Sequence, residues 1–295
     1  MEQTNLISQF DQLNLAVSYD IPAYPKAIVQ IVHGMCEHKE RYYPFMQYLK
    51  QNGYAVIIHD HRGHGGSVYN ENDLGDFYTT NYIGIVKDMY QVSNFAKNLC
   101  PGLPLYIFSH SMGTLVTRCY LKKYDDMADK VILCGTPTRN HLADFAIILA
   151  KIRNSFYNGP DDYLNNLVMK PFNKRFNAPY LWLSKSEKNI RSYKEDRLCG
   201  FTFKTNGFIN LFTLLKEAYC TDYLMLNPDL KILLIAGSDD PVIVNEEKFE
   251  ELKHFLQARG YKSVTSKLYE SLRHEILNED NNEFIYQDIV NFFDK

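Results

Sequence analysis

The sequence predicts an α/β fold with a mostly parallel central sheet, helices on both faces and a helical insertion. Short apolar runs rich in β-branched residues alternate with stretches of helical periodicity, as expected for strands buried on both faces. After the N-terminal region, the predicted strands are residues 27–32, 54–59, 105–108, 131–135, 231–236 and 264–269. With 295 residues, 45% of them hydrophobic, the chain is long enough to give this sheet a sizeable core.

The segments between these strands supply the hairpin and helices of this architecture. Residues 7–20 alternate weakly between polar and apolar side chains and predict a first hairpin. Apolar residues at helical spacing predict helices over residues 41–51, 82–99, 115–120, 246–259 and 284–293. Glycine or proline follows three of these segments closely, which indicates where the helices end.

The alternation of strands and helices stops between residues 138 and 225, where we expect no core strand. We therefore expect residues 1–137 and 226–295 to form the α/β core, and residues 138–225 to form a helical cap over one end of the sheet. One helical stripe in this segment carries Leu142, Phe145, Leu149, Ile152 and Phe156, with Ile147 and Ile148 beside it. Such a helix either packs against other inserted helices or lines an acyl-chain tunnel, where it can also touch lipid.

Composition narrows the class of partner and the cellular compartment. The formal net charge of −3 does not favour nucleic acid or an anionic membrane surface. The six cysteines form no C-x-x-C pair and lie mostly in apolar surroundings, so we expect reduced thiols and a cytoplasmic protein. The N-terminus shows no signal-peptide pattern, and no apolar run reaches the roughly 18 residues of a membrane span.

The segment 105–120 contains the first catalytic motif. An apolar strand runs into S-H-S-M-G, and a helical pattern follows at once. A serine in a sharp strand-to-helix turn is the nucleophile elbow of an α/β-hydrolase, which makes Ser111 the candidate nucleophile. The usual pattern is G-x-S-x-G; Gly113 fits it, whereas Ser109 replaces the first glycine with a slightly larger residue.

The strand 27–32 ends in His33 and Gly34, where this fold places its oxyanion loop. A glycine lets the backbone turn so that the next amide points into the site. We therefore expect the backbone N–H groups of Met35 and Met112 to form the oxyanion hole, with His33 and Gly34 supporting the loop. Taken alone, the same pair of residues also fits an ordinary turn at the end of a strand.

Three histidines after the strand 54–59 suggest a metal site. The segment 59–64, H-D-H-R-G-H, approaches the H-x-H-x-D-H ligand pattern of metallo-β-lactamases. Gly63 occupies the position of the aspartate that binds the second metal, so the ligand set of His59, His61 and His64 is broken. We expect these side chains to hydrogen-bond to neighbouring loops and support the oxyanion loop, with no metal and no cofactor.

A serine nucleophile needs a base and an acid, which follow it in this fold in the order serine, acid, histidine. Asp239 and Asp240 follow the strand 231–236, and His274 follows the last strand. We expect Ser111, Asp240 and His274 to form the triad. Asp240 is preferred because it stands three residues after the glycine that ends its strand; Asp239 is the alternative.

These motifs together resemble those of monoacylglycerol lipases and bacterial lysophospholipase-like α/β-hydrolases. The matching stretches are residues 33–42 (H-G-M-C-E-H-K-E-R-Y), 60–67 (D-H-R-G-H-G-G-S), 110–113 (H-S-M-G), 237–242 (G-S-D-D-P-V) and 273–279 (R-H-E-I-L-N-E), with residues 182–185 and 193–201 in the insertion. The resemblance implies cofactor-free hydrolysis of carboxylic esters, with monoacylglycerols or lysophospholipids as substrates.

Other functions share part of this pattern. A carboxylesterase for small esters, or an amidase or peptidase, would use the same triad. A non-catalytic binding protein or a metal-dependent hydrolase are the alternatives from other classes. An apolar cap would favour acyl chains and would allow transient contact with a membrane surface.

Overall fold

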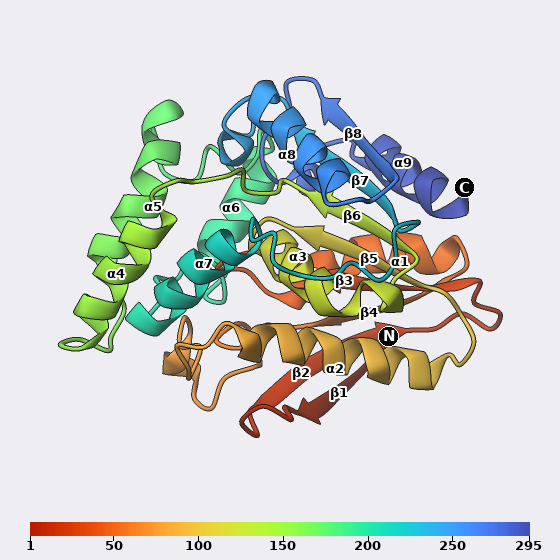
Figure 1. The fold of residues 1–295 in the computed structure, drawn as a ribbon, viewed down its shortest axis with the longest axis horizontal. Helices are drawn as coiled ribbons and strands as arrows, with labels where there is room; N and C mark the ends of the chain where they lie inside the picture. The colour runs from red at the N-terminus through yellow and green to blue at the C-terminus, as the bar shows by residue number, and fades with distance from the viewer.

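The protein, described over residues 1–295 by a computed structural model, has the predicted α/β architecture (Figure 1). One eight-stranded sheet has the order β1-β2-β4-β3-β5-β6-β7-β8. Its strands are β1 (Glu2–Ile7), β2 (Asn14–Asp20), β3 (Ala27–Val32), β4 (Tyr54–His59), β5 (Leu105–His110), β6 (Lys130–Cys134), β7 (Lys231–Gly237) and β8 (Ser263–Tyr269).

Strand pairing defines the direction of the sheet. β1 and β2 form an antiparallel hairpin in which Leu6 lies opposite Leu15, and β2 joins β4 antiparallel. All other neighbours are parallel, with Ile31 opposite Phe108 between β3 and β5. The predicted hairpin is therefore present, but its first strand ends at Ile7, where the sequence pattern begins to alternate.

Nine α-helices accompany the sheet: α1 (Tyr43–Gln51), α2 (Ile83–Leu99), α3 (Met112–Tyr124), α4 (Ala143–Asn154), α5 (Asp162–Arg175), α6 (Glu187–Glu195), α7 (Thr205–Glu217), α8 (Glu246–Ala258) and α9 (Glu283–Asp294). Side chains of β6 alternate between two cores. Val131 and Leu133 pack with residues of α2, α3 and α8, whereas Ile132 packs with residues of α1 and α9. Helices thus cover both faces of the sheet.

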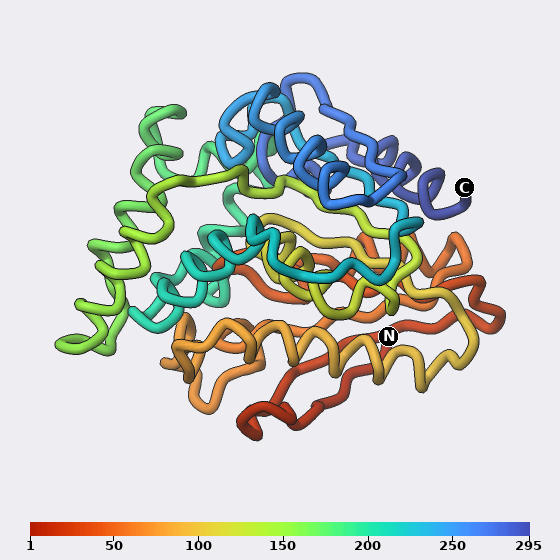
Figure 2. The backbone as a smooth tube through the Cα atoms, in the orientation of Figure 1, coloured from red at the N-terminus to blue at the C-terminus, as the bar shows by residue number.

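The helices α4 to α7 lie between β6 and β7 in the chain, and no strand of the sheet interrupts them. Figure 2 shows the backbone leaving β6, forming these helices at the left of the view, and returning to β7. None of the helices in the structure combines the length and apolar character needed to cross a membrane.

The apolar stripe of α4 faces away from the neighbouring helices. The buried residues of α4 are Ala143, Ala146 and Ala150, and this helix packs against α7. The large side chains Leu142, Phe145, Ile148, Ile152 and Phe156 are exposed. Of the two arrangements considered, packing against inserted helices is therefore wrong for most members of the stripe, because the alanine face makes that contact. Leu149 of the stripe is partly buried against the core.

Candidate active site

Ser111 occupies a tight turn between β5 and α3. Its backbone lies at φ 51° and ψ −122°, a strained conformation for a non-glycine residue. Its amide donates to the Cys134 carbonyl oxygen at 2.9 Å, which holds the turn against the end of β6. A Cβ on Gly113 would lie 2.3 Å from the Val32 carbonyl oxygen, so the turn requires glycine there.

The sheet accommodates the serine that replaces the first glycine of the motif. Ser109 is fully buried within β5. Its Oγ donates to the Ile132 carbonyl oxygen on β6 at 3.1 Å. Because this hydroxyl has a partner, the substitution does not leave a buried polar group unpaired.

The structure brings Asp240 and His274 together. His274 Nδ1 lies 2.8 Å from Asp240 Oδ2, and both residues are buried. The second oxygen of Asp240 accepts the amide of Val242 at 2.8 Å, so the carboxylate has a fixed orientation. Asp239 does not reach the histidine: its carboxylate is half-exposed and lies 3.7 Å from Lys185 Nζ.

Gly135 packs against both members of this pair, although no sequence motif pointed to it. It follows the β6 residue that binds the Ser111 amide, and its φ is 58°. A Cβ there would lie 3.0 Å from the His274 ring and 3.2 Å from Asp240 Oδ2. On its other side His274 contacts Trp182 of the insertion, with ring centres 5.1 Å apart. Gly135 thus connects the residue that binds the Ser111 amide to the pair of Asp240 and His274, and all three candidate residues follow the carboxyl ends of parallel strands.

The loop after β3 packs directly on the nucleophile. A Cβ on Gly34 would lie 3.0 Å from the Ser111 Cβ. The amide of Met35 has no hydrogen-bond partner within the protein. Met112 is the first residue of α3, and the first amides of a helix have no partner inside it. Both predicted oxyanion donors are thus on segments that border Ser111.

Buried histidines support this loop from behind. His33 Nδ1 donates to the Gly34 carbonyl oxygen at 2.8 Å, and His33 Nε2 accepts the His61 amide at 2.9 Å. His61 Nε2 in turn donates to the His33 carbonyl oxygen at 3.1 Å. Burial lowers the pKa of His33 and of His61 well below the ordinary value, so both imidazoles are neutral.

Of the three histidines considered as metal ligands, His61 and His64 have this structural role, whereas neither ring nitrogen of His59 has a hydrogen-bond partner. His64 Nδ1 donates to the Arg62 carbonyl oxygen at 3.0 Å, and its Nε2 accepts the Cys36 amide at 3.3 Å. Both ring nitrogens of His64 are therefore engaged with backbone groups of neighbouring turns. Burial lowers the pKa of His59 and of His64 to about 4. The expectation that the histidines hydrogen-bond to neighbouring loops thus agrees with the contacts of His61 and His64 and is wrong for His59.

A charged network joins the oxyanion loop, the histidine loop and the insertion. Arg41 donates to Glu37 Oε2 at 2.7 Å and to both oxygens of Glu275 at 2.7 and 2.8 Å. Asn189 of α6 donates to Glu275 at 2.7 Å. Burial alone would raise the pKa of Glu275, but the charge of Arg41 holds it below its ordinary value. Sequence motifs contained Glu37, Arg41 and Glu275 without indicating that they contact one another, and no motif contained Asn189.

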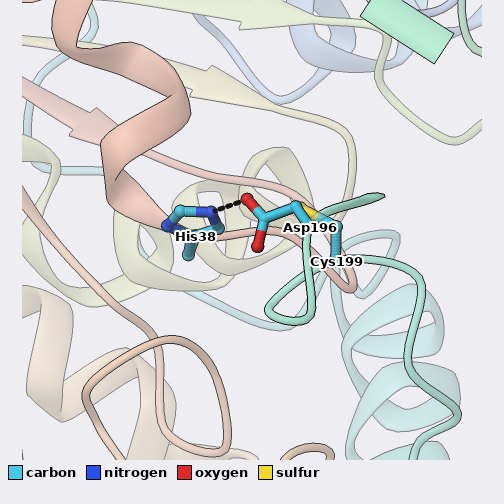
Figure 3. A group of neighbouring side chains, drawn as sticks. All are labelled: His38, Asp196 and Cys199. Carbon is cyan, nitrogen blue, oxygen red and sulfur yellow. Dashed lines mark hydrogen bonds and ion pairs between the residues drawn. The ribbon is translucent and has the colours of Figure 1, made fainter. Parts of the chain in front are cut away.

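His38, Asp196 and Cys199 form a second cluster, which Figure 3 shows. His38 Nε2 lies 2.7 Å from Asp196 Oδ2, closer than the roughly 3.4 Å between ligand atoms around a tetrahedral zinc ion. Burial raises the pKa of the Cys199 thiol, which disfavours the thiolate that a metal requires. The nearby positive charge of Arg41 would also repel a metal cation. The cluster is therefore a hydrogen-bonded link between the oxyanion loop and the insertion.

Comparison with known proteins identifies the family of the chain. The family model described as serine aminopeptidase, S33, matches residues 23–281, and the chain belongs to that family of α/β-hydrolases. A monoglyceride lipase homolog of monkeypox virus is 34% identical over 115 residues, which are 39% of this chain and 40% of the viral protein. The monoacylglycerol lipase of Mycolicibacterium smegmatis is 23% identical over 273 residues, covering 91% of this chain and 88% of the relative.

Among solved structures, a highly thermostable carboxyl esterase from Bacillus coagulans, crystallised with glycerol, superposes with a TM-score of 0.90. It is 25% identical, and the match covers 99% of this chain and 97% of the esterase. The predicted resemblance to monoacylglycerol lipase-like hydrolases is confirmed, and the protein is a carboxylic ester hydrolase. The alternative of a non-catalytic binding protein is accordingly not retained.

Proposed function

We propose that the protein hydrolyses carboxylic esters through an acyl-Ser111 intermediate. The buried pair of Asp240 and His274, next to a strained serine turn, carries this proposal. Because Nδ1 of His274 is bound to Asp240, Nε2 is the nitrogen left to take the Ser111 proton and pass it to the leaving alcohol. A water molecule then attacks the acyl group with the same histidine as base, and the acid leaves.

The proposal assigns charge stabilisation to two backbone amides. The tetrahedral intermediates place a negative charge on the former carbonyl oxygen. The N–H groups of Met35 and Met112 would donate to this oxygen from segments fixed by Gly34 and by the start of α3. Each such donor contributes about 3–4 kcal/mol to the transition state in comparable enzymes.

We propose esters with a single acyl chain, monoacylglycerols or lysophospholipids, as the substrate class. Two observations on relatives support it: the mycobacterial relative is named a monoacylglycerol lipase, and the Bacillus esterase was crystallised with glycerol. Residues 138–225 would act as a cap, since Trp182 of this segment contacts the His274 ring. An ester substrate bound at Ser111 would thus lie partly under the insertion.

A labelling experiment tests the nucleophile. Wild type and Ser111→Ala are treated with a fluorophosphonate probe, and turnover of p-nitrophenyl esters from acetate to palmitate is measured in parallel. Labelling and turnover should both disappear in the variant. Retained turnover in Ser111→Ala would refute the acyl-serine mechanism. An optimum at the shortest esters would point to a small-ester carboxylesterase, and faster cleavage of the matching anilides would point to an amidase or peptidase.

We further propose that the exposed stripe of α4 touches the lipid surface that holds the substrate. Phe145 and Phe156 are 64% and 87% exposed, and each large apolar side chain inserted into lipid contributes about 1.5–3 kcal/mol. Phe145→Glu should therefore weaken sedimentation with phosphatidylcholine vesicles. Phe284→Glu on α9, another exposed phenylalanine, is the matched control. Equal sedimentation of Phe145→Glu, Phe284→Glu and wild type would contradict the proposal.

A further inference from the structure

The side chain of His110, the residue before Ser111, lies between the oxyanion loop and the histidine loop. Its Nδ1 is 3.2 Å from Glu37 Oε1, and its Nε2 is 3.3 Å from the main-chain oxygen of His274. Both partners are hydrogen-bond acceptors. A neutral imidazole carries only one N–H, so both bonds are satisfied together only when His110 is an imidazolium.

The partners of Glu37 leave it no room for the proton. Its Oε1 already accepts the Gly34 amide at 2.6 Å and the Tyr42 hydroxyl at 2.9 Å. Its Oε2 accepts Arg41 at 2.7 Å. Oε1 therefore accepts two donors besides facing His110, and a proton on Oε1 would take up acceptor capacity that these two donors use. An ionised Glu37 keeps all of these bonds, so the proton shared with His110 resides on the histidine.

The charge balance of the buried network leads to the same assignment. Glu37 and Glu275 are both buried and share a single guanidinium, that of Arg41. Two carboxylates and one guanidinium would leave an uncompensated negative charge, which is costly in a protein interior. A positive charge on His110, itself buried, makes the set neutral.

On balance, the groups that face His110 raise its pKa, which favours the imidazolium. Burial alone would lower the pKa of His110, but the hydrogen bond to Glu37, with the charges of Glu37 and Glu275, raises it above the ordinary value. From the histidine loop, the His274 ring lies with its centre 4.6 Å from that of His110. Burial would raise the pKa of Glu37, yet His110 and Arg41 hold it well below its usual range.

We propose that His110 is held as an imidazolium and serves as a positioning residue for ester hydrolysis. The chain of contacts runs from the Gly34 amide through Glu37 and His110 to the carbonyl oxygen of His274. It fixes the separation between the oxyanion loop and the general base. The kinetic consequence rests on the function proposed above, whereas the protonation state does not.

Nuclear magnetic resonance tests the protonation state directly. Protein labelled with ¹⁵N-histidine is examined at pH 7.5, where a free histidine is about nine-tenths neutral. We expect a doubly protonated ring whose signals disappear in His110→Gln and persist in Ser111→Ala. Persistence in Ser111→Ala separates this result from any failure of the proposed nucleophile. A neutral His110 ring at pH 7.5 would overturn the proposal.

Kinetics test the positioning role. A glutamine at position 110 can donate to the His274 oxygen but cannot pair with Glu37 as a cation. We expect kcat of His110→Gln for a soluble ester to fall about 10- to 100-fold, with KM changed less than about threefold, because small displacements of reacting groups have effects of that size. Wild-type kcat should also decline as the pH rises through the raised pKa of His110, and this decline should be absent in His110→Gln. An unchanged kcat, or a decline that persists in the variant, would overturn the role.

Two further variants guard against a purely structural effect. Glu37→Gln keeps the shape of the partner and removes its charge, so it should neutralise His110 in the ¹⁵N spectrum and lower kcat by itself. The double variant Glu37→Gln/His110→Gln should lose no more activity than the worse single variant, because both act through one pair. Losses that multiply would overturn the proposal. His38→Gln, which also disrupts a buried histidine–carboxylate pair, is the matched control and should keep the wild-type alkaline decline.

Discussion

The buried histidines behind the oxyanion loop should make the fold sensitive to acid. Burial lowers the pKa of His59 and of His64 from 6.5 to about 4. Between these two pH values the unfolded chain binds more protons than the folded one, so the free energy of unfolding falls as the pH falls. Above pH 6.5 neither histidine makes the free energy of unfolding depend on pH, and below pH 4 the loss of unfolding free energy is complete. Relative to its value above pH 6.5, the free energy of unfolding should fall by roughly 2 kcal/mol for each histidine at pH 5 and by roughly 3 kcal/mol below pH 4. These figures take about 1.4 kcal/mol for each pKa unit.

His59 allows the cleanest test, because neither of its ring nitrogens has a hydrogen-bond partner. In His59→Leu no bond is broken and one titrating group disappears. Urea unfolding should show that the variant gains about 2 kcal/mol relative to wild type between pH 7.5 and pH 5. Ile58→Val, a buried change on the same strand, should cost about 0.5–1.5 kcal/mol at every pH. If His59→Leu follows the wild-type pH dependence, His59 takes up its proton in the folded state and the reasoning is wrong.

Four further substitutions test the catalytic turn and the acid. Asp240→Asn should lower kcat about 10³- to 10⁴-fold, whereas Asp239→Asn should stay within about threefold of wild type in the same ester assay; equal losses would contradict the assignment. Gly113→Ala should lower the free energy of unfolding by about 1–3 kcal/mol or more, because its Cβ would meet the Val32 carbonyl oxygen; wild-type stability in urea would contradict the tight turn. Ser109→Gly should cost about 1–2 kcal/mol in the same unfolding assay and keep fluorophosphonate labelling; lost labelling would show that the turn needs the serine.

Local sequence patterns predicted the core strands because each is a short apolar run with its own signal. The first strand lacks such a signal. β1 (Glu2–Ile7) is largely exposed, and it is held by pairing with β2 at the edge of the sheet. β5 likewise extends past its apolar run to His110, because parallel pairing continues until that residue lies opposite Cys134. Pairing with a neighbour, which periodicity does not describe, decides such boundaries.

The insertion shows a second limit of pattern reasoning. Helical spacing grouped most of the exposed apolar residues on one side, but it placed the partly buried Leu149 with them and the exposed Ile148 beside them. It also does not say what that side faces. The inward side carries Ala143, Ala146 and Ala150, small residues that let α7 approach closely. Most of the large residues therefore stay exposed, whereas Ile147 and Leu149 pack partly against the core.

Motif positions indicated Asp240 and His274, which the structure brings into contact, because their loops follow strands that end at one edge of the sheet. Motif reasoning gave no role to His110. This residue bonds to Glu37, which is 73 positions away in the sequence, and to His274, which is 164 positions away. Partners so distant in sequence become neighbours only through the order of the strands. The sequence could therefore predict which residues take part but not the charged pair that connects them.

The oxyanion-loop motif H-G-x-x-E-H has a physical reason for each of its fixed positions. His33 bonds to the loop after β4, and Gly34 leaves space for the nucleophile. Glu37 binds the residue that precedes Ser111, and His38 binds Asp196 in the insertion. Four contacts thus lead from six consecutive residues to three different parts of the chain: the loop after β4, the turn at residues 110–111 and the insertion. A shift of the insertion that pulled on His38 would reach the oxyanion loop within a few bonds, so substrate entry under the insertion and the geometry of the oxyanion hole should be mechanically coupled.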